Sequence, residues 1–353
     1  MNKLSWRNLG PQTVSGLYLW VLFIAVFGVW KPHLFLTSAT VHSVASSQAI
    51  ATMLALALLI PLTAGIYDLS VGAVINVSTV LVVEFQTKYH HGMWLSILLT
   101  VLSCAAIGAV SGFIVVKLKV NSFVATLGMA TIVTAIQEIV SNQTQPFPPV
   151  SRSWSNLTQH NVFGFQIVVL YMIVLAFIVW WLLARTPVGR YLYAIGGSPD
   201  AARLTGVRVG FWSWLSLIGS ATIAGVAGVF YASLSGPSLT FGQGLLLPAF
   251  AAVFLGSTQF TPGRANVWGT LVAVYVLATG VQGLQFVTGV LWLNDMFNGV
   301  ALIAAVSFAV WRQTRPIKAR VDDNPLSPAA LGDDHGRDPV DASSLPVPHP
   351  LPS

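Results

Sequence analysis

Five polar side chains stand within long apolar stretches or close to their ends, and their chemistry suits the recognition of a hydroxylated solute. They are Asn76, Gln137, Glu138, Asn294 and Asn298. A binding site for such a solute combines a few hydrogen-bonding amides or carboxylates with a largely apolar wall. We therefore predict that these residues line a path for a small polar solute. The alternative is that they only cap helix ends beneath external loops.

Four acids allow a second chemistry, which is proton transfer along a relay. Asp68, Glu84, Glu138 and Asp295 all precede the acidic C-terminal segment. A relay needs acids spaced along one path inside the bilayer, whereas three of these stand near the ends of apolar segments and Asp68 stands in a loop. The pattern therefore disfavours an ion-coupled secondary transporter. Glu84 also precedes Lys88 by four residues, which predicts an ion pair at the membrane interface.

The sequence carries no pattern typical of catalysis or of metal binding. His90 and His91 offer two ligands without a third, which favours an exposed loop over a metal site. The single Cys104 stands in an apolar segment and cannot form an internal disulfide. No Gly-Lys dipeptide occurs, so there is no phosphate-binding P-loop. We predict no catalytic residue, no metal and no cofactor bound by this chain.

The composition indicates an all-α protein that crosses a membrane several times. Of 353 residues, 55% are apolar and 8% are charged, whereas soluble domains carry about 25% charged residues. Apolar runs of about 20 residues are long enough to cross a bilayer as helices. We predict about ten crossings, joined in places by broken helices and Gly-rich loops, near residues 15–30, 46–64, 71–87, 93–116, 121–140, 163–184, 211–232, 245–258, 265–285 and 291–311.

The distribution of basic residues predicts that both termini are cytoplasmic. With the N-terminus inside, fourteen Lys and Arg residues fall on inner segments and three on outer ones, namely Lys31, Lys88 and Arg152. The net charge of +6 is explained by these inner loops rather than by a nucleic-acid partner. We predict a cytoplasmic N-terminus over 1–14, a membrane domain over 15–311 that starts with an uncleaved span, and a disordered cytoplasmic tail over 312–353.

A short capped helix is predicted inside the inner loop 185–210. In "GGSPDAARLTG", Ser198 suits the N-cap, Pro199 the first helical position and Asp200 the positive end of the helix dipole. Gly206 suits the position that ends the helix. A helix of about seven residues is marginal alone in water, so it needs a surface. It either joins two spans at the membrane surface or docks a cytoplasmic partner.

Two loops also read as broken helices. Only 15 residues separate Asp68 from Glu84, and Gly65 and Gly72 weaken the start of that helix. Transporters tolerate such breaks where a cavity or protein satisfies the backbone. Asp68 either caps the following helix, binds an arginine, or stands in a plain turn. Residues 256–263 form a second break.

These segments resemble the permease subunits of bacterial ABC importers for ribose and related monosaccharides. "GRYLYAIGGSPDAARLTGVRV" resembles their loop for coupling to the ATPase, "AGIYDLSVGAV" and "VFLGSTQFTPGRANVWGTLVA" resemble signature loops, and "NSFVATLGMATI" resembles the start of their fifth span. The coupling positions are Gly189, Arg190, Ala194, Gly197, Asp200, Ala201, Ala202, Arg203 and Gly206. The signature positions are Gly65, Asp68, Leu69, Ser70, Gly72, Gly256, Gly263, Gly269 and Thr270. Ile66, Tyr67, Pro262 and Asn266 depart from the usual pattern.

The resemblance implies a multi-pass permease in the bacterial inner membrane, importing a monosaccharide or a small polyol. ATP would be bound by a separate cytoplasmic ATP-binding subunit, which docks on the 189–207 loop. A periplasmic sugar-binding protein would deliver the solute, and a second permease copy or a paralogue would complete the pathway.

Overall fold

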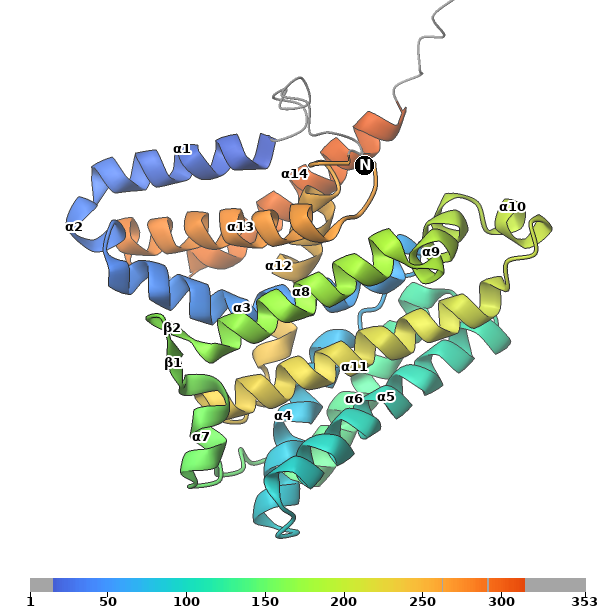
Figure 1. The fold of residues 1–353 in the computed structure, drawn as a ribbon, viewed down its shortest axis with the longest axis horizontal. Helices are drawn as coiled ribbons and strands as arrows, with labels where there is room; N and C mark the ends of the chain where they lie inside the picture. Colours follow the sequence, from blue (N-terminus) through green and yellow to red (C-terminus); the bar gives the residue numbers. More distant parts are fainter. Residues whose placement is uncertain (1–14, 262, 291, 315–353) are drawn as a thin grey trace, which may run out of the picture. The chain divides into compact units, whose positions relative to one another are not determined.

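The computed structural model describes residues 15–261, 263–290 and 292–314, which form one unit made almost entirely of helices (Figure 1). The predicted N-terminal segment 1–14 and the predicted tail from residue 315 onward lie outside the described residues. The last helix continues to Thr314, so residues 312–314 are helical rather than part of the predicted disordered tail. Each of the ten predicted crossings overlaps one long helix in the described part of the chain.

The helices that overlap these ten segments are α1 (Ser15–Trp30), α3 (Ser38–Thr63), α4 (Val71–Thr87), α5 (Met93–Lys117), α6 (Ser122–Ser141), α8 (Ile167–Arg185), α11 (Val209–Ser235), α12 (Phe241–Gly256), α13 (Val267–Thr288) and α14 (Trp292–Thr314). Among the described residues, six of them (α3, α5, α6, α8, α11 and α13) are long and apolar enough to cross a membrane. Three others, α1, α4 and α12, contain shorter apolar helices of 10–17 residues.

Four short helices and a hairpin connect the long helices. The short helices are α2 (Pro32–Phe35), α7 (Arg152–Gln159), α9 (Pro187–Gly197) and α10 (Pro199–Leu204). Strands β1 (Asn161–Val162) and β2 (Phe165–Gln166) pair antiparallel, with Asn161 opposite Gln166. The hairpin occupies the start of the predicted crossing 163–184, so that helix begins later, at Ile167. Phe163 and Gly164 have positive φ, which turns the chain there.

Two other predicted boundaries are wrong because polar residues also form helix. The segment "SATVHSVASS" extends α3 back to Ser38, and the Thr37 hydroxyl caps it by accepting a hydrogen bond from the Thr40 amide at 3.2 Å. Helix α12 begins at Phe241, before the predicted start of that crossing at residue 245. The positions of polar residues therefore indicated where apolar runs end, but not where the helices end.

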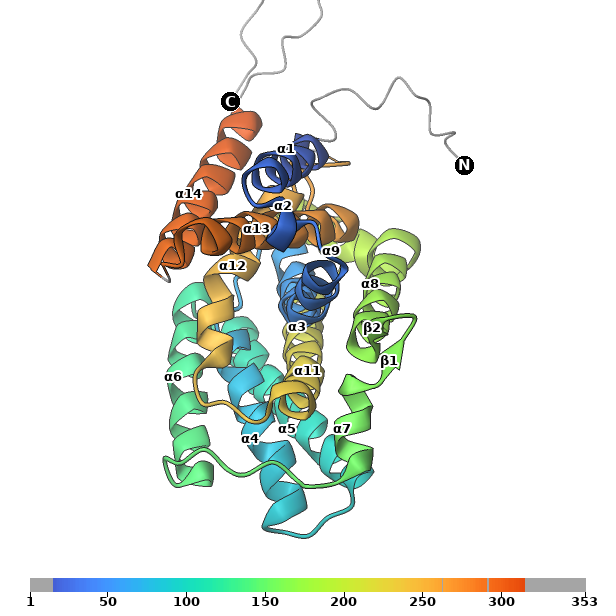
Figure 2. The same ribbon diagram turned by 90° about the vertical axis from the view of Figure 1, so that its left-hand side faces the viewer.

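Helix α3 lies at the centre of the described helices. The helices α1, α13, α3, α11 and α5 lie side by side in that order, α8 lies on one side of α3, and α4, α6 and α12 lie on the other (Figures 1 and 2). A helix that is apolar on all sides is either buried in the protein core or spans a membrane, and the apolar part of α3 is packed against its neighbouring helices. Met53, Leu54, Leu56 and Leu59 of α3 are accordingly fully buried.

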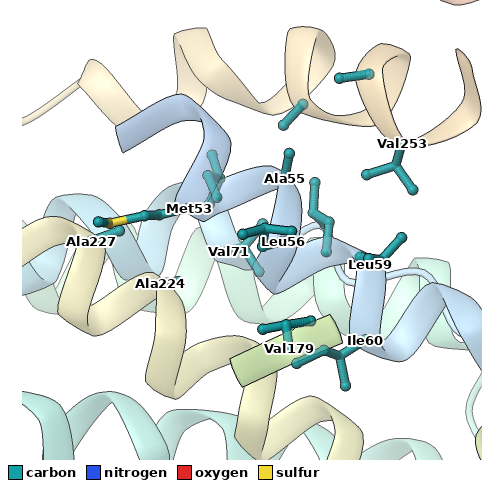
Figure 3. Packing of buried hydrophobic residues seen from close by; sticks show 14 of the residues in the cluster. Met53, Ala55, Leu56, Leu59, Ile60, Val71, Val179, Ala224, Ala227 and Val253 are labelled. Carbon is teal, nitrogen blue, oxygen red and sulfur yellow. The ribbon is translucent and has the colours of Figure 1, made fainter. Parts of the chain in front are cut away.

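Small side chains let the neighbouring helices approach α3 closely. Ala224 and Ala227 of α11, Val179 of α8 and Val253 of α12 belong to the same buried cluster as Met53, Leu56 and Leu59 of α3, and Ala227 lies beside Met53 (Figure 3). Association of helices in a membrane depends on such close packing, since lipid is as apolar as the core. The same cluster includes Ala64 and Ile66 of the loop that follows α3, and Ala265 of the loop that follows α12 packs against it.

Candidate functional site

The predicted helix in the 185–210 loop is present as α10, with the predicted caps. The Ser198 hydroxyl accepts a hydrogen bond from the Ala201 amide at 3.3 Å, and Pro199 is the first helical residue. Gly206 has a φ of +84°, and the Gly206 and Val207 amides donate to the carbonyls of Arg203 and Ala202 at 3.0 and 3.1 Å. This arrangement is a Schellman motif, which requires a left-handed residue. Local sequence therefore determines where α10 begins and ends.

Helix α10 rests on one buried residue and exposes its remaining face. Ala202 is 3% exposed, whereas Leu204 is 90% exposed. Asp200 and Arg203 are exposed and form an ion pair at 3.2 Å, which contributes little to stability in water. An exposed leucine beside an exposed ion pair is a surface that a partner protein can cover. The sequence reasoning did not single out Leu204.

Helix α9 precedes α10 and was not predicted as a separate helix. Pro187 occupies its first turn, and Leu192 and Ile195 are buried at helical spacing. These two signals were available in the sequence. Of the predicted coupling positions, Gly189, Arg190, Ala194 and Gly197 belong to α9, and Gly189 packs against the carbonyl of Leu183 at the end of α8.

Helix α9 contacts the first signature loop through a glycine. A Cβ atom on Gly196 would overlap the carbonyl oxygen of Thr63, at the end of α3. Gly65 follows with a φ of +74°, which an L side chain rarely adopts. The close approach of the two backbones therefore requires glycine at position 196.

Helix α9 contacts the second signature loop through Tyr193. The Tyr193 hydroxyl donates a hydrogen bond to the Ala265 carbonyl at 2.6 Å, and the Arg264 guanidinium stands 4.2 Å from the centre of the Tyr193 ring. Burial raises the pKa of the Tyr193 phenol, and the charge of Arg264 opposes only part of this rise. The phenol thus remains a hydrogen-bond donor at neutral pH. Tyr193, Gly196 and Arg264 were missed because their partners are distant in sequence.

These contacts surround one cavity of about 480 Å³. Both signature loops and α9 line it, with residues that include Gly65, Tyr67, Tyr193, Gly197 and Arg264. The loop predicted to receive force is therefore joined directly to the two loops at the ends of α3 and α12.

Asp68 in the first signature loop forms a turn at the start of α4. Its carboxylate accepts hydrogen bonds from the Ser70 amide at 3.1 Å and from the Ser70 hydroxyl at 2.6 Å. Asp68 is 1% exposed and makes no ion pair with a described arginine. Burial raises the pKa of its carboxyl, against the opposing hydrogen bonds from Ser70. Of the alternatives for Asp68, the structure shows a buried turn.

The first loop is also bound to α6 and α12. The Leu69 amide donates to the Thr126 hydroxyl at 3.0 Å, and that hydroxyl also lies 3.1 Å from the Tyr67 carbonyl oxygen. A Cβ atom on Gly72 would lie 2.8 Å from the Gly242 carbonyl oxygen. Leu69, Ser70 and Gly72 therefore fix where α4 begins against its neighbours.

Asn266 organises the second signature loop. Its side-chain oxygen accepts from the Gly269 amide at 2.7 Å, and its side-chain nitrogen donates to the carbonyls of Gly256 and Gln259 at 3.1 and 2.9 Å. Gly256 and Gly269 touch without space for a Cβ atom, and the Thr270 hydroxyl donates to the Asn266 carbonyl at 2.9 Å. Gly263 has a φ of +84°. One amide therefore joins the end of α12 to the start of α13.

Replacement of Asn266 by alanine is expected to destabilise the protein by about 2 kcal/mol or more, because it removes the N-cap of α13 and the side-chain hydrogen bonds to the carbonyls of Gly256 and Gln259. Thermal unfolding in detergent measures this as a lower midpoint. Asn121 provides the matched control, since its side chain accepts one hydrogen bond, from the Phe123 amide at the start of α6. An equal loss in Asn121→Ala and Asn266→Ala would contradict the role given to Asn266.

Two predicted path residues, Asn76 and Gln137, hold the segment between α11 and α12. The Asn76 side-chain oxygen accepts from the Gly242 amide at 2.6 Å, and its nitrogen donates to the Leu239 carbonyl at 3.1 Å and also contacts the Gln243 amide oxygen. The Gln137 side-chain nitrogen donates to the same Leu239 carbonyl at 3.1 Å. Both residues are at most 1% exposed. Their position thus gives them a structural role, while Glu138 is exposed.

The other two, Asn294 and Asn298, line a cavity of about 210 Å³ between α3, α12, α13 and α14. Gln48 of α3 lines the same cavity. Nothing in the sequence distinguishes Gln48 from its neighbours, because it stands in the polar half of α3. The structure therefore separates the five predicted path residues into two that hold a loop, one that is exposed, and two that share a cavity.

The four acids considered for a proton relay do not lie along one path. Asp68 is buried in its loop, Glu84 is half-buried near the end of α4, and Glu138 and Asp295 are exposed. The predicted ion pair between Glu84 and Lys88 is absent: the ammonium of Lys88 lies 5.9 Å from the centre of the Tyr89 ring instead, and the described residues contain one ion pair, between Asp200 and Arg203. Lys88 ends α4 as its C-cap.

Comparison with known proteins identifies similar transport permeases. A family model described as "Branched-chain amino acid transport system / permease component" matches residues 40–306. The fructose import permease protein of Rhizobium meliloti is 31% identical over 85% of this chain and 86% of its own length. The D-allose transport system permease protein of Escherichia coli is 25% identical over 86% of this chain and 92% of its own length. The ribose import permease protein of the same species is 28% identical over 81% and 90%. No solved structure matches the chain significantly.

Proposed function

Because the chain belongs to the branched-chain amino acid transport system / permease component family, it is a membrane permease, and we propose that it imports a monosaccharide or a related small polyol as the transmembrane subunit of an ABC importer. The relatives named for fructose, D-allose and ribose support a sugar as the substrate. A separate ATP-binding subunit supplies the energy, since the sequence has no Gly-Lys dipeptide for a P-loop.

One observation carries the proposal of coupling, namely that α9 is packed on both signature loops. Gly196 touches the end of α3, and Tyr193 and Arg264 connect α9 to the start of α13. An ATPase subunit that binds the exposed face of α10 and moves it would therefore displace α3 and α13 together. Packed interiors transmit such a displacement because they are dense and scarcely compressible.

The proposed topology has ten crossings, with both termini in the cytoplasm of a bacterial cell and the permease in its inner membrane. The ten long helices of the described chain and the excess of basic residues on the proposed inner segments support it. A binding protein delivers the sugar from the periplasm, and a second copy of the permease, or a paralogue, completes the pathway.

Reconstitution in proteoliposomes tests the function. The permease, the ATP-binding subunit and the binding protein encoded beside it are combined, and uptake of radiolabelled ribose, fructose and D-allose is measured. At least one sugar should enter only when ATP reaches the ATPase subunit, and uptake should persist when an ionophore collapses the proton gradient. Uptake driven by a proton gradient without the ATPase subunit would overturn the proposal in favour of an ion-coupled transporter.

The position of α10 can be tested by cysteine labelling. The one cysteine, Cys104, is buried in α5, so Cys104→Ala gives a cysteine-free background. Arg203→Cys in that background should react with a membrane-impermeant maleimide only after the cells are permeabilised. Arg152→Cys, on a proposed outer segment, should react in intact cells. Labelling of the cysteine at position 203 in intact cells would show that α10 faces the outside, which contradicts the proposed topology.

A further inference from the structure

The cavity between α3, α12, α13 and α14 contains hydrogen-bonding groups that have no partner. Gln48, Asn294 and Asn298 line it, and the side chains of these three residues make no hydrogen bond with the described part of the chain. The side-chain oxygen of Asn294 is hidden from solvent and unpaired. A buried polar atom without a partner is energetically unfavourable, because it has lost its hydrogen bonds to water. The side chains of these three residues therefore differ from those of Asn76 and Asn266, which bind neighbouring backbone.

A proline inside α12 lines the same cavity. Pro248 stands inside α12 and has no N–H group, so it cannot donate to the Gly244 carbonyl four residues earlier. Gly244 and Pro248 both line the cavity. Interrupted helices near the middle of the membrane are where transporters place solute sites. Helix α12 continues through Pro248, and the Gly244 carbonyl, without its usual helical donor, adds an acceptor from a second helix to the three amides.

The rest of the lining limits the class of ligand. It is apolar, with Ala51, Leu245, Val274, Leu277 and Val281 among its residues, and it contains no charged side chain. An amino acid carries an ammonium and a carboxylate group, which are costly to place in an apolar site without opposite charges. A neutral polyol carries hydroxyl groups that both donate and accept, as amides do, and C–H groups that suit an apolar wall. A volume of about 210 Å³ also far exceeds the roughly 10–15 Å³ that one water requires.

We propose that this cavity is a binding site for a neutral monosaccharide or polyol in transit, with Gln48, Asn294 and Asn298 as its hydrogen-bonding side chains and the Gly244 carbonyl as a backbone acceptor. The inference rests on the proposed function and adds to it the residues that hold the solute. The uncharged lining of the cavity also explains how this chain can carry a sugar although the description of its family names branched-chain amino acids.

The test replaces each amide by leucine, which keeps the approximate size and removes the hydrogen bonds. In the reconstituted importer, Asn294→Leu and Gln48→Leu should each lower uptake of the transported sugar about tenfold at subsaturating concentration, the effect of about 1.4 kcal/mol per hydrogen bond. Ala278→Phe, which fills the cavity from α13, should block uptake. Gln282→Leu is the matched control, because Gln282 lines a different cavity beside α1 and should leave uptake unchanged.

A second readout separates binding from folding. Deoxy analogues of the transported sugar should enter wild-type proteoliposomes more slowly, and Asn294→Leu should no longer discriminate against the analogue that lacks the hydroxyl it binds. In a variant that is merely misfolded, uptake of the sugar and of all its analogues would fall equally. Sugar uptake that is equal in wild type, Gln48→Leu, Asn294→Leu and Ala278→Phe would overturn the cavity assignment and leave the proposed function intact.

Failure of the proposed function gives a different result. Wild-type proteoliposomes would then import leucine or valine rather than a sugar. Both the proposed function and the sugar-binding cavity would be contradicted. If no solute enters, thermal unfolding of the purified permease with millimolar ribose, fructose or D-allose decides the inference. A sugar-dependent rise in midpoint that Asn294→Leu abolishes supports the site, and the absence of any such rise overturns it.

Discussion

Replacement of both Asp200 and Arg203 by alanine is expected to uncouple ATP hydrolysis from sugar uptake. These side chains are exposed on α10 beside Leu204, and their ion pair is not needed to fold the helix, whose caps come from Ser198 and Gly206. Loss of two polar anchors at a protein interface weakens binding about tenfold or more. Uptake in proteoliposomes should therefore fall at least about tenfold, while the hydrolysis that remains is no longer stimulated by the sugar-loaded binding protein.

The unfolding midpoint of the double variant should match that of the wild type, because the ion pair is solvent-exposed. Lys117→Ala is the control: it removes an exposed positive charge at the end of α5, on another proposed inner loop. Uptake in the double variant equal to that in Lys117→Ala would show that α10 does not receive the ATPase subunit.

Gly196→Ala is expected to have a comparably large effect through packing. The added Cβ atom would overlap the Thr63 carbonyl oxygen, and because carbon and oxygen atoms stay about 3.3 Å apart, α9 must move away by about 1 Å. Overpacking of this kind costs about 1–3 kcal/mol. The same movement strains the Tyr193 contact with Ala265, so we expect uptake to fall at least about tenfold and the unfolding midpoint to drop.

Gly197→Ala is a closely matched control for this prediction. The two glycines are adjacent in α9, but a Cβ atom on Gly197 would meet no atom within 4 Å. Since alanine favours helix over glycine by about 1 kcal/mol, Gly197→Ala should leave the unfolding midpoint unchanged or slightly raised. Equal behaviour of the two variants would mean that α9 is not held against the end of α3.

The predicted features that the structure confirms are those determined over a few residues. The caps of α10 at Ser198 and Gly206 depend on neighbours three or four positions away, and apolar length alone located the long helices. The predicted starts of α3, α8 and α12 were wrong. Helices α3 and α12 begin earlier because polar residues can continue a helix, and α8 begins later because a hairpin occupies the start of its apolar run. The number of crossings and the cytoplasmic termini remain predictions.

The roles of the polar residues depended on distant partners. Asn76 and Gln137 have the residue types of solute ligands, yet they bind the Leu239 carbonyl from α4 and α6. Asn294 and Asn298 have the same residue types and face a cavity. Nothing in the sequence near these four residues distinguishes the two pairs, because the difference lies in which other helix is opposite each one.

The sequence by itself determined that this chain is a helical membrane protein. It also determined the capped helix α10 in a loop predicted to be cytoplasmic, and it carries motifs that resemble those of sugar importers. Only the tertiary structure decided that α9 joins both signature loops and that Gln48 shares a cavity with Asn294 and Asn298. The physical reason is range: caps and apolar runs act between neighbours in the chain, whereas a shared cavity or a close backbone approach forms only after separate helices have packed.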